Sequence, residues 1–267
     1  MIIIPARLQS TRLPNKLLLP LDGVPIIVRV ANIAKELDSC VVACDDEAIL
    51  EVCKKHKIEC VMTAKTHTSG TDRCAEAVSN LGLGENEVVI NLQGDEPFIE
   101  PGVIEKLKNA MQNAINWGDS ALDFVLDSAN LALDSTDSAS NSTDSSDSIF
   151  MASCYKTISD TEADDPNLVK VVVNSRNLAL YFSRSKIPYN RENIAMEHLG
   201  HLGIYAFSAK SLREFCGLSK SPLEEIEKLE QLRTLWHNKK ILMVKVESKS
   251  IGIDTLEDYE KAKEILT

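Results

Sequence analysis

The chain has 267 residues, which suits one large α/β domain or a domain with a smaller lobe. Its formal net charge is −11 and its pI is near 5.0, so we expect neither nucleic-acid binding nor binding to anionic membranes. The seven cysteines fall mostly in apolar runs without a CxxC pair, which argues against a disulfide framework. The first apolar run ends at Pro5 and Arg7, so we expect no signal peptide and no membrane insertion, and a cytoplasmic protein.

The first 118 residues alternate short β-branched runs with longer amphipathic ones. Apolar runs typical of buried parallel strands occupy 1–4, 39–44, 57–62 and 86–91. Helical spacing of apolar residues covers 25–37, 46–56, 70–82 and 101–115, with Asp45 and Asp46 as candidate N-caps. Four β-α repeats of this length predict right-handed crossovers and a doubly wound sheet, whose ligands bind beyond the carboxyl ends of the strands.

Residues 119–148 differ sharply in composition from the rest of the chain. They contain nine serines, seven aspartates and no cation. The first half has helical spacing from Leu122 to Leu133, and the second half is polar and of low complexity. We interpret the segment as a disordered surface insertion that interrupts a single domain spanning 1–267.

The remainder of the chain predicts several strands without long helices between them. Strand patterns occur at 149–156, 167–174, 177–190 and 200–207, which favours a smaller antiparallel lobe at about 175–215. One long helix is predicted at 221–238, a strand at 240–247, and a final helix capped by Thr255. The predicted fold class is therefore α/β and Rossmann-like, with a mostly parallel (mixed) central sheet.

Three cations follow the first predicted strand, in "PARLQSTRLPNK". Arg7, Arg12 and Lys16 would place two guanidinium groups and one ammonium around exposed backbone N–H groups, with Ser10 and Thr11 between the arginines. Such an arrangement is typical of a phosphate-binding loop, although neither GxxxxGK[ST] nor GxGxxG is present. The alternative from charge alone is a solvated basic loop.

Two acidic residues are placed to complement those cations. Asp95 follows a buried strand in "NLQGDEPFI", and Asp254 follows a short apolar run in "SIGIDTLED". Carboxylates facing a phosphate loop are natural Mg²⁺ ligands, because this hard ion prefers one or two carboxylates plus phosphate oxygens. The pattern predicts metal-assisted phosphoryl or nucleotidyl transfer, although Asp254 alone could be a turn or N-cap residue.

The order of motifs resembles the 3-deoxy-manno-octulosonate cytidylyltransferases, the CMP-Kdo synthetases. The resemblance covers essentially all of the chain outside 119–148. It depends on "IPARLQSTRLPNK", "THTSGTDR", "NLQGDEPFI", "LYFSRSKIPY", "GHLGIYAF", "SPLEEIEKLEQLR" and "GIDTLED". Asn15 stands where this family usually carries glycine, a mild departure because asparagine tolerates left-handed backbone.

The resemblance implies a transfer of CMP from CTP to Kdo for lipopolysaccharide biosynthesis, a magnesium cofactor, and a homodimer formed through the smaller lobe. It implies a catalytic set of Arg12, Lys16, Asp95 and Asp254, in which the two aspartates bind Mg²⁺. The implied nucleotide-binding set is Ala6, Arg7, Ser10, Thr11, Arg12, Lys16, Ser69, Gly70, Arg73 and Gln93. The implied sugar-binding set is Gln93, Arg184, His201, Tyr205 and Glu230.

Simpler interpretations of these residues stay open. Arg184 could be a surface charge, Tyr205 a core residue, and Glu230 a solvated residue on a helix whose buried stripe includes Ile226. The "THTSGTDR" stretch could also cap the next helix through Thr71. Two rival functions remain: another nucleotidyltransferase such as a CMP-sialate synthetase, which should lack QGDEP and HLGIY together, and a non-enzymatic nucleotide-binding or scaffolding protein.

Overall fold

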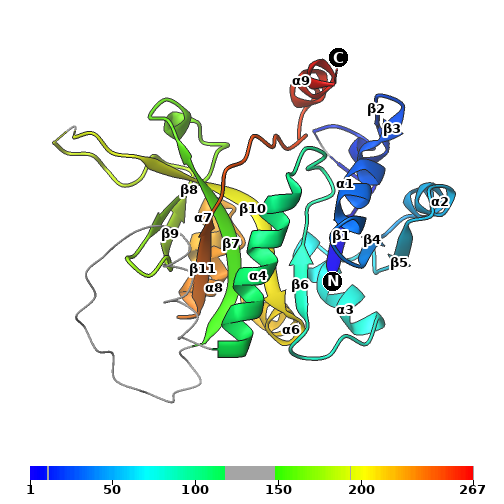
Figure 1. Cartoon of the computed structure of the whole chain (residues 1–267), viewed down its shortest axis with the longest axis horizontal. Helices are drawn as coiled ribbons and strands as arrows, with labels where there is room; N and C mark the ends of the chain where they lie inside the picture. The colour runs from blue at the N-terminus through cyan, green and yellow to red at the C-terminus, as the bar shows by residue number, and fades with distance from the viewer. Residues whose placement is uncertain (11, 118–147, 193, 267) are drawn as a thin grey trace. The chain divides into compact units, whose positions relative to one another are not determined.

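The computed structural model describes residues 1–10, 12–117, 148–192 and 194–266 (Figure 1). The chain divides into two compact units. The first comprises Met1–Glu105, Gly203–Cys216 and Ser248–Thr267, and the second comprises Lys106–Leu202 and Gly217–Glu247. The predicted lobe at 175–215 is thus shared between the units, and the expectation of a single domain with this lobe stays a prediction. The predicted insertion lies outside the described residues except for Ser148.

The first unit is built on four parallel strands in the order β6-β1-β4-β5. The C-terminal half of β10 (His198–Ser208) runs antiparallel to β6, with Tyr205 opposite Asn91. The parallel strands are β1 (Ile2–Ala6), β4 (Cys40–Cys44), β5 (Glu59–Met62) and β6 (Val88–Asn91). Every residue of β1, β4 and β6 is buried, as expected for parallel strands covered on both faces.

Helices connect these strands, as the apolar spacing predicts. The connecting helices are α1 (Ile26–Lys35), α2 (Glu47–Lys55) and α3 (Gly70–Asn80). After β6 come α4 (Pro101–Trp117) and, later in the chain, α6 (Ala209–Gly217) and α9 (Leu256–Ile265). The side chain of Asp46 caps α2 by accepting a hydrogen bond from the Ala48 amide. Thr255 caps α9 as predicted, within a reciprocal capping box with Asp258. A small hairpin, β2 (Pro20–Leu21) and β3 (Val24–Pro25), precedes α1.

The strand order places a topological switch point between β1 and β6. The chain moves from β1 through β4 to β5, and then α3 returns it to β6 on the other side of β1. Connections on either side of this point leave in opposite directions, so the loops after β1 and β6 flank a crevice. The positively charged loop and the QGDEP stretch are these two loops.

The second unit contains mixed strands. Within it β7 (Ile149–Ile158) pairs in parallel with β11 (Lys240–Lys245), while β8 (Lys170–Val173) pairs antiparallel with β9 (Ala179–Ser183) and with Gly200 of β10. The prediction of an α/β fold with a mostly parallel sheet and a smaller antiparallel part is confirmed. None of the described helices is long and apolar enough to cross a membrane.

The single helix predicted over 221–238 is wrong. Two short helices, α7 (Pro222–Glu227) and α8 (Leu232–Trp236), take its place, because Lys228 adopts a left-handed backbone with φ 55°. The turn lets the Arg233 guanidinium donate to both carboxylate oxygens of Glu224, at 2.6 and 2.9 Å, in a buried ion pair. Ile226, predicted to be buried, is 80% exposed.

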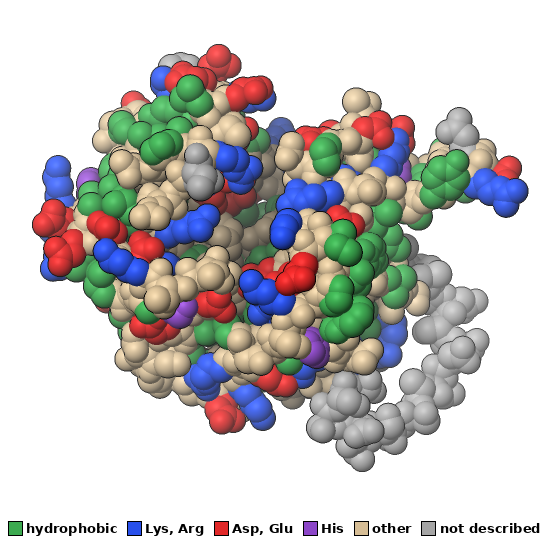
Figure 2. All heavy atoms as spheres, turned by 180° about the vertical axis from the view of Figure 1, so that it is seen from behind, with side chains coloured by type: hydrophobic (Ala, Val, Ile, Leu, Met, Phe, Trp, Pro, Cys, Tyr) green, Lys and Arg blue, Asp and Glu red, His purple; other side chains and the backbone are tan. Residues whose placement is uncertain are grey.

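Acidic and basic side chains alternate over the face of the molecule shown in Figure 2, with hydrophobic side chains scattered among them. No broad field of a single sign is visible on this face. Any binding of a highly charged ligand there therefore depends on a local arrangement of cations rather than on a general surface potential.

Candidate active site

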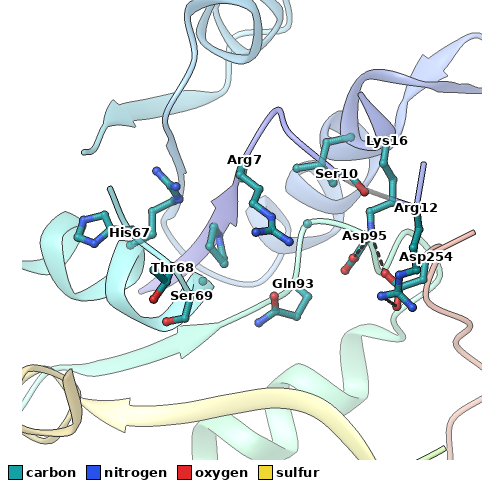
Figure 3. Close-up of a pocket in the computed structure, with 16 residues that line it drawn as sticks. Arg7, Ser10, Arg12, Lys16, His67, Thr68, Ser69, Gln93, Asp95 and Asp254 are labelled. Atoms are coloured by element: carbon teal, nitrogen blue, oxygen red, sulfur yellow. Dashed lines mark hydrogen bonds and ion pairs between the residues drawn. The ribbon is translucent and has the colours of Figure 1, made fainter. Parts of the chain in front are cut away.

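The loop after β1 is fixed at both ends. The Leu8 amide donates to Oδ1 of Asp45 at 3.1 Å, and Asp45 itself follows the neighbouring strand β4. At the other end Asn15 has φ 54° and ψ 26°, which is a left-handed conformation. Glycine and asparagine both tolerate this conformation, and glycine is the residue usual at this position in the family that the sequence resembles. A short 3₁₀ turn, η1 (Lys16–Leu18), begins directly after Asn15 and directs the Lys16 side chain into the pocket (Figure 3).

The Lys16 ammonium lies between the two predicted metal ligands. Its Nζ is 2.5 Å from Oδ2 of Asp95 and 2.8 Å from Oδ1 of Asp254, and only 9% of the Lys16 side chain is exposed. Burial acts to lower the pKa of Lys16, but the two carboxylates outweigh burial, so this pKa is raised above its ordinary value. The group is therefore a permanent cation at neutral pH, and it brings together two acids separated by more than 150 residues of sequence.

The remaining predicted groups of this loop are more exposed. An Nη2–Oδ2 contact of 2.9 Å joins Arg12 to Asp254, with side chains 61% and 50% exposed, so this ion pair alone adds little stability. Arg7 is exposed and projects from the end of β1 toward Gln93 (Figure 3). Ser10 also lines the pocket, whereas Thr11 lies outside the described residues.

The opposite wall is the beginning of α3. Ser69 caps this helix by accepting a hydrogen bond from the Asp72 amide at 3.1 Å. The alternative that this stretch caps the helix is therefore right, but the capping residue is Ser69 and not Thr71. Thr71 is buried instead, and its hydroxyl accepts a hydrogen bond from Asn91. Gly70 lies so close to β1 that an added Cβ would be 3.1 Å from the Pro5 side chain. This close approach places the N-terminus of α3 at the pocket. Its free backbone N–H groups and the helix dipole can stabilise an anion there.

Arg73 supports the pocket wall with a guanidinium that is occupied by protein acceptors. It donates to Thr63 Oγ1 at 2.6 Å and to Asp45 Oδ2 at 2.9 Å, and its side chain is only 3% exposed. The same Asp45 carboxylate therefore fixes both the loop after β1, through Leu8, and the beginning of α3, through Arg73. Asp45 was predicted only as a helix cap. Its position directly after a central strand could have indicated that it lies near the site and holds neighbouring loops.

The loop after β6 completes the pocket. Gln93 donates to Asn91 at 3.1 Å and extends into the pocket (Figure 3). An added Cβ on Gly94 would be 3.2 Å from the Pro5 carbonyl oxygen, so glycine allows this loop to lie against β1. The described lining of the pocket is Pro5, Ala6, Arg7, Ser10, Arg12, Lys16, Leu17, His67, Thr68, Ser69, Gly70, Arg73, Gln93, Gly94, Asp95 and Asp254.

His67 and Thr68 line the pocket although neither was among the predicted site residues. The Nε2 atom of His67 forms a short contact with the Glu76 carboxylate, which also accepts a hydrogen bond from the Ala64 amide. The hydrogen bond from the Ala64 amide lowers the pKa of Glu76 most, and the His67 contact lowers it further, although desolvation acts in the opposite direction. The "THTSGTDR" motif indicated that the segment leading into α3 forms part of the site, but its pattern did not show which of its side chains face the pocket.

The predicted sugar-binding residues fall in both units. Gln93 and Tyr205 belong to the first unit, where Tyr205 is a half-buried residue of β10. In the second unit, Arg184 Nε donates to the Glu227 carbonyl at 2.8 Å, and Glu230 lies 3.6 Å from Arg233. The assignment of these residues to a sugar stays a prediction.

His201, also of the second unit, is buried beside Ser153 and Phe182. Its Nε2 is 2.8 Å from Ser153 Oγ, and its ring packs edge-on against Phe182 at 5.0 Å between centroids. Burial lowers the pKa of His201 to about 3. A neutral imidazole at pH 7 would serve as a hydrogen-bonding group and not as a cation.

This buried histidine should make the protein sensitive to acid. Between about pH 3 and 6.5, His201 is protonated in the unfolded chain and neutral in the folded chain. The free energy of unfolding therefore falls as the pH drops below about 6.5. At pH 5 the expected loss is about 2 kcal/mol. Urea unfolding at pH 7 and pH 5 should show a larger loss for the parent protein than for His201→Gln. Equal losses of stability in the two proteins would show that His201 is not the group responsible for the acid sensitivity.

The comparisons with known proteins agree with this geometry. A family model described as cytidylyltransferase matches residues 1–241. The 3-deoxy-manno-octulosonate cytidylyltransferase of Wolinella succinogenes is 50% identical over 99% of this chain and 98% of its own length, and that of Helicobacter pylori strain G27 is 48% identical over 100% and 98%. A solved structure of CMP:2-keto-3-deoxy-manno-octonic acid synthetase complexed with CTP is 35% identical, with a TM-score of 0.80 over 99% of this chain and 97% of that one.

A doubly wound sheet with a cation-lined pocket at its switch point, together with the family match, defines a nucleotidyltransferase of the cytidylyltransferase class. Within that class, the chain belongs to the 3-deoxy-manno-octulosonate cytidylyltransferases. The resemblance drawn from the sequence motifs is thus confirmed. A 4-diphosphocytidyl-2C-methyl-D-erythritol synthase from Anaerococcus prevotii, 13% identical with a TM-score of 0.58, shares the fold alone.

Proposed function

We propose that the protein transfers the CMP group of CTP to 3-deoxy-D-manno-octulosonate, giving CMP-Kdo and pyrophosphate for lipopolysaccharide biosynthesis. The observation that carries this proposal is the pairing of Lys16 with Asp95 and Asp254 in the pocket at the switch point. A triphosphate would need cations, and a metal ion bound with it would need carboxylates. Here the Lys16 ammonium lies in contact with two carboxylates, so both kinds of group are present in one pocket.

The two aspartates suit a magnesium ion. Both present carboxylate oxygens within hydrogen-bond reach of the same Lys16 nitrogen, so a small cation could contact both in its place. Two carboxylates plus phosphate oxygens form a ligand set that Mg²⁺ prefers. When bound, the ion would neutralise phosphate charge and increase the acidity of the sugar hydroxyl.

The chain's own residues would bind and orient the nucleotide. In this proposal Lys16 and Arg12 turn from the carboxylates to the β- and γ-phosphates, and Arg7, Ser10 and Thr11 assist them. The anomeric hydroxyl of the sugar loses its proton to solvent as its oxygen attacks the α-phosphorus in line. The bond from the α-phosphorus to the bridging β-phosphate oxygen breaks, and pyrophosphate leaves with its negative charge held by these cations. No covalent intermediate with the protein is required.

The other wall would bind the nucleoside. Ala6, Ser69, Gly70 and Gln93 line the pocket there and can approach a ligand closely. Arg73 would act by holding this wall, since its donors are taken by Thr63, Ala64 and Asp45.

The proposal also covers the residues that bind the sugar, the oligomeric state and the cellular location. We assign Gln93, Arg184, His201, Tyr205 and Glu230 to the sugar, with Arg184 suited to its carboxylate because a guanidinium can bind a carboxylate through two hydrogen bonds. The family resemblance supports a homodimer and a cytoplasmic location.

Mass spectrometry of the reaction products tests this function. Incubation with CTP, Kdo and Mg²⁺ should yield a species with the mass of CMP-Kdo, and an excess of EDTA should prevent its appearance. CTP left unchanged with Mg²⁺ present would contradict the activity. Product formation undiminished in EDTA would contradict the role given to the two aspartates.

A further inference from the structure

Asp254 lies on a stretch of chain that has no regular structure of its own. Residues 248–254, here called the strap, contain neither helix nor strand, and they precede α9. The Asp254 side chain is half exposed, yet it contacts both Lys16 and Arg12. An irregular, partly exposed segment does not hold a carboxylate in place by itself, so its anchors decide the geometry of the Asp95–Asp254 pair.

Two glutamates after β6 accept hydrogen bonds from the strap. Glu100 accepts from the Ser248 hydroxyl and from the Lys249 amide, each at 2.7 Å. Glu96 accepts from the Ser250 hydroxyl at 2.8 Å. Hydrogen bonds to ionised carboxylates are among the stronger ones in proteins, so the strap has charged anchors over its first three residues.

The end of the strap lies directly against the QGDEP loop. The Ile253 amide donates to the backbone carbonyl of Asp95 at 2.9 Å, and the Ile253 side chain is fully buried. An added Cβ on Gly252 would be 2.9 Å from Oε1 of Glu96, so only glycine fits here without displacing that carboxylate. The loop that carries one predicted metal ligand thus holds the backbone that carries the other.

Asp254 is also fixed on its C-terminal side. Oδ2 of Asp258 accepts hydrogen bonds from the amides of Asp254, at 3.1 Å, and Thr255, at 2.8 Å. Those amides would otherwise be unpaired at the beginning of α9. The Asp254 backbone is therefore held from both directions. The upstream anchors, Glu96 and Glu100, belong to the segment between β6 and α4.

We propose that Glu96 and Glu100 are positioning residues, which anchor the strap so that the Asp254 carboxylate stays close enough to Asp95 for one divalent cation to bind both. Neither glutamate was assigned a role from the sequence, although Glu96 adjoins Asp95 in the QGDEP motif. The inference rests on the proposed function, since it concerns the cation assigned to that site. Groups that orient metal ligands typically change metal affinity 10- to 100-fold when they are replaced.

Mn²⁺ binding tests the proposal without turnover. Free Mn²⁺ is measured by electron paramagnetic resonance in the presence of CTP and the absence of sugar, for the parent protein, Glu96→Gln, Ser250→Ala and Glu105→Gln. We expect Glu96→Gln to weaken Mn²⁺ binding at least about 10-fold and Ser250→Ala to weaken it less. Glu105→Gln is the matched control, because Glu105 is an exposed carboxylate in the helix that follows Glu100, and it should bind as the parent does.

A second readout separates positioning from damage to the fold. Calorimetric binding of CTP in EDTA should change less than about twofold in Glu96→Gln, because Arg12 and Lys16 are intact. Equal Mn²⁺ affinities in all four proteins would overturn the inference alone. A parallel loss of metal-free CTP binding would overturn it in favour of a general structural role. If the parent protein itself shows no CTP-dependent Mn²⁺ binding, the metal part of the proposed function fails and the inference fails with it.

Discussion

Replacing Asp95 with asparagine is expected to lower kcat about 10³-fold while leaving the fold nearly intact. The change keeps the shape of the side chain but removes a charge that contacts the Lys16 ammonium and would bind the metal. Lewis-acid stabilisation by a bound ion is worth several kcal/mol in a transition state, which corresponds to this loss of rate. The stability cost should be about 1 kcal/mol, because Asp95 is partly exposed and Lys16 keeps its contact with Asp254.

Steady-state kinetics at saturating Mg²⁺, together with thermal unfolding, check this expectation. Asp22→Asn is a suitable control, because Asp22 is 80% exposed and its left-handed backbone accepts asparagine. Parent-like turnover of Asp95→Asn at saturating Mg²⁺ would remove Asp95 from the metal site. A loss of folding as large as the loss of turnover would show a structural role instead.

Replacing Lys16 with alanine should weaken CTP binding about 100-fold. The ammonium forms charge-assisted hydrogen bonds, each worth about 1.5–3 kcal/mol. Its removal leaves Asp95 without this cation and Asp254 with only the exposed Arg12 contact, so the two neighbouring carboxylates repel a triphosphate. The KM for the sugar should change far less. Lys16→Met, which keeps most of the apolar stem, should resemble Lys16→Ala if charge and not packing is responsible.

The pH dependence of this effect follows from the raised pKa of Lys16. Because folding raises the pKa of Lys16 above its ordinary value of about 10.4, the ammonium stays protonated from pH 6 to 9, and its contribution is lost only as the pH rises beyond that ordinary value. The difference in CTP affinity between the parent and Lys16→Ala should therefore not reflect titration of Lys16 between pH 6 and 9. Titration calorimetry with CTP across this range measures it, with the exposed Lys54→Ala as control. Unchanged CTP affinity in Lys16→Ala would count against the phosphate role.

The first half of the fold could be predicted because its signals are local. Runs such as "CVVAC" are buried on both faces of β4, and alternation of these runs with amphipathic helices determines the crossovers. Asn15 adopts a left-handed backbone, which agrees with the expectation that asparagine is a mild departure from the glycine usual in the family. The rule that ligands bind at strand ends then placed the cation loop and Asp95 at one crevice.

Features that depend on tertiary partners could not be predicted in the same way. The apolar spacing over 221–238 indicated one helix, but the buried Glu224–Arg233 pair and the left-handed Lys228 divide it. The roles of Asp45 and Glu96 are set by acceptors and donors far away in sequence, which no local pattern reveals. The assignment of Arg184, His201, Tyr205 and Glu230 to the sugar rests on the family resemblance and stays a prediction.

The proposed activity can be measured as pyrophosphate release from CTP in the presence of Mg²⁺, with Kdo compared against N-acetylneuraminate. We expect rapid release with Kdo and little with N-acetylneuraminate, with Asp95→Asn nearly inactive in the same assay. Release with N-acetylneuraminate alone would instead indicate a CMP-sialate synthetase, and no release with either sugar would contradict the activity itself.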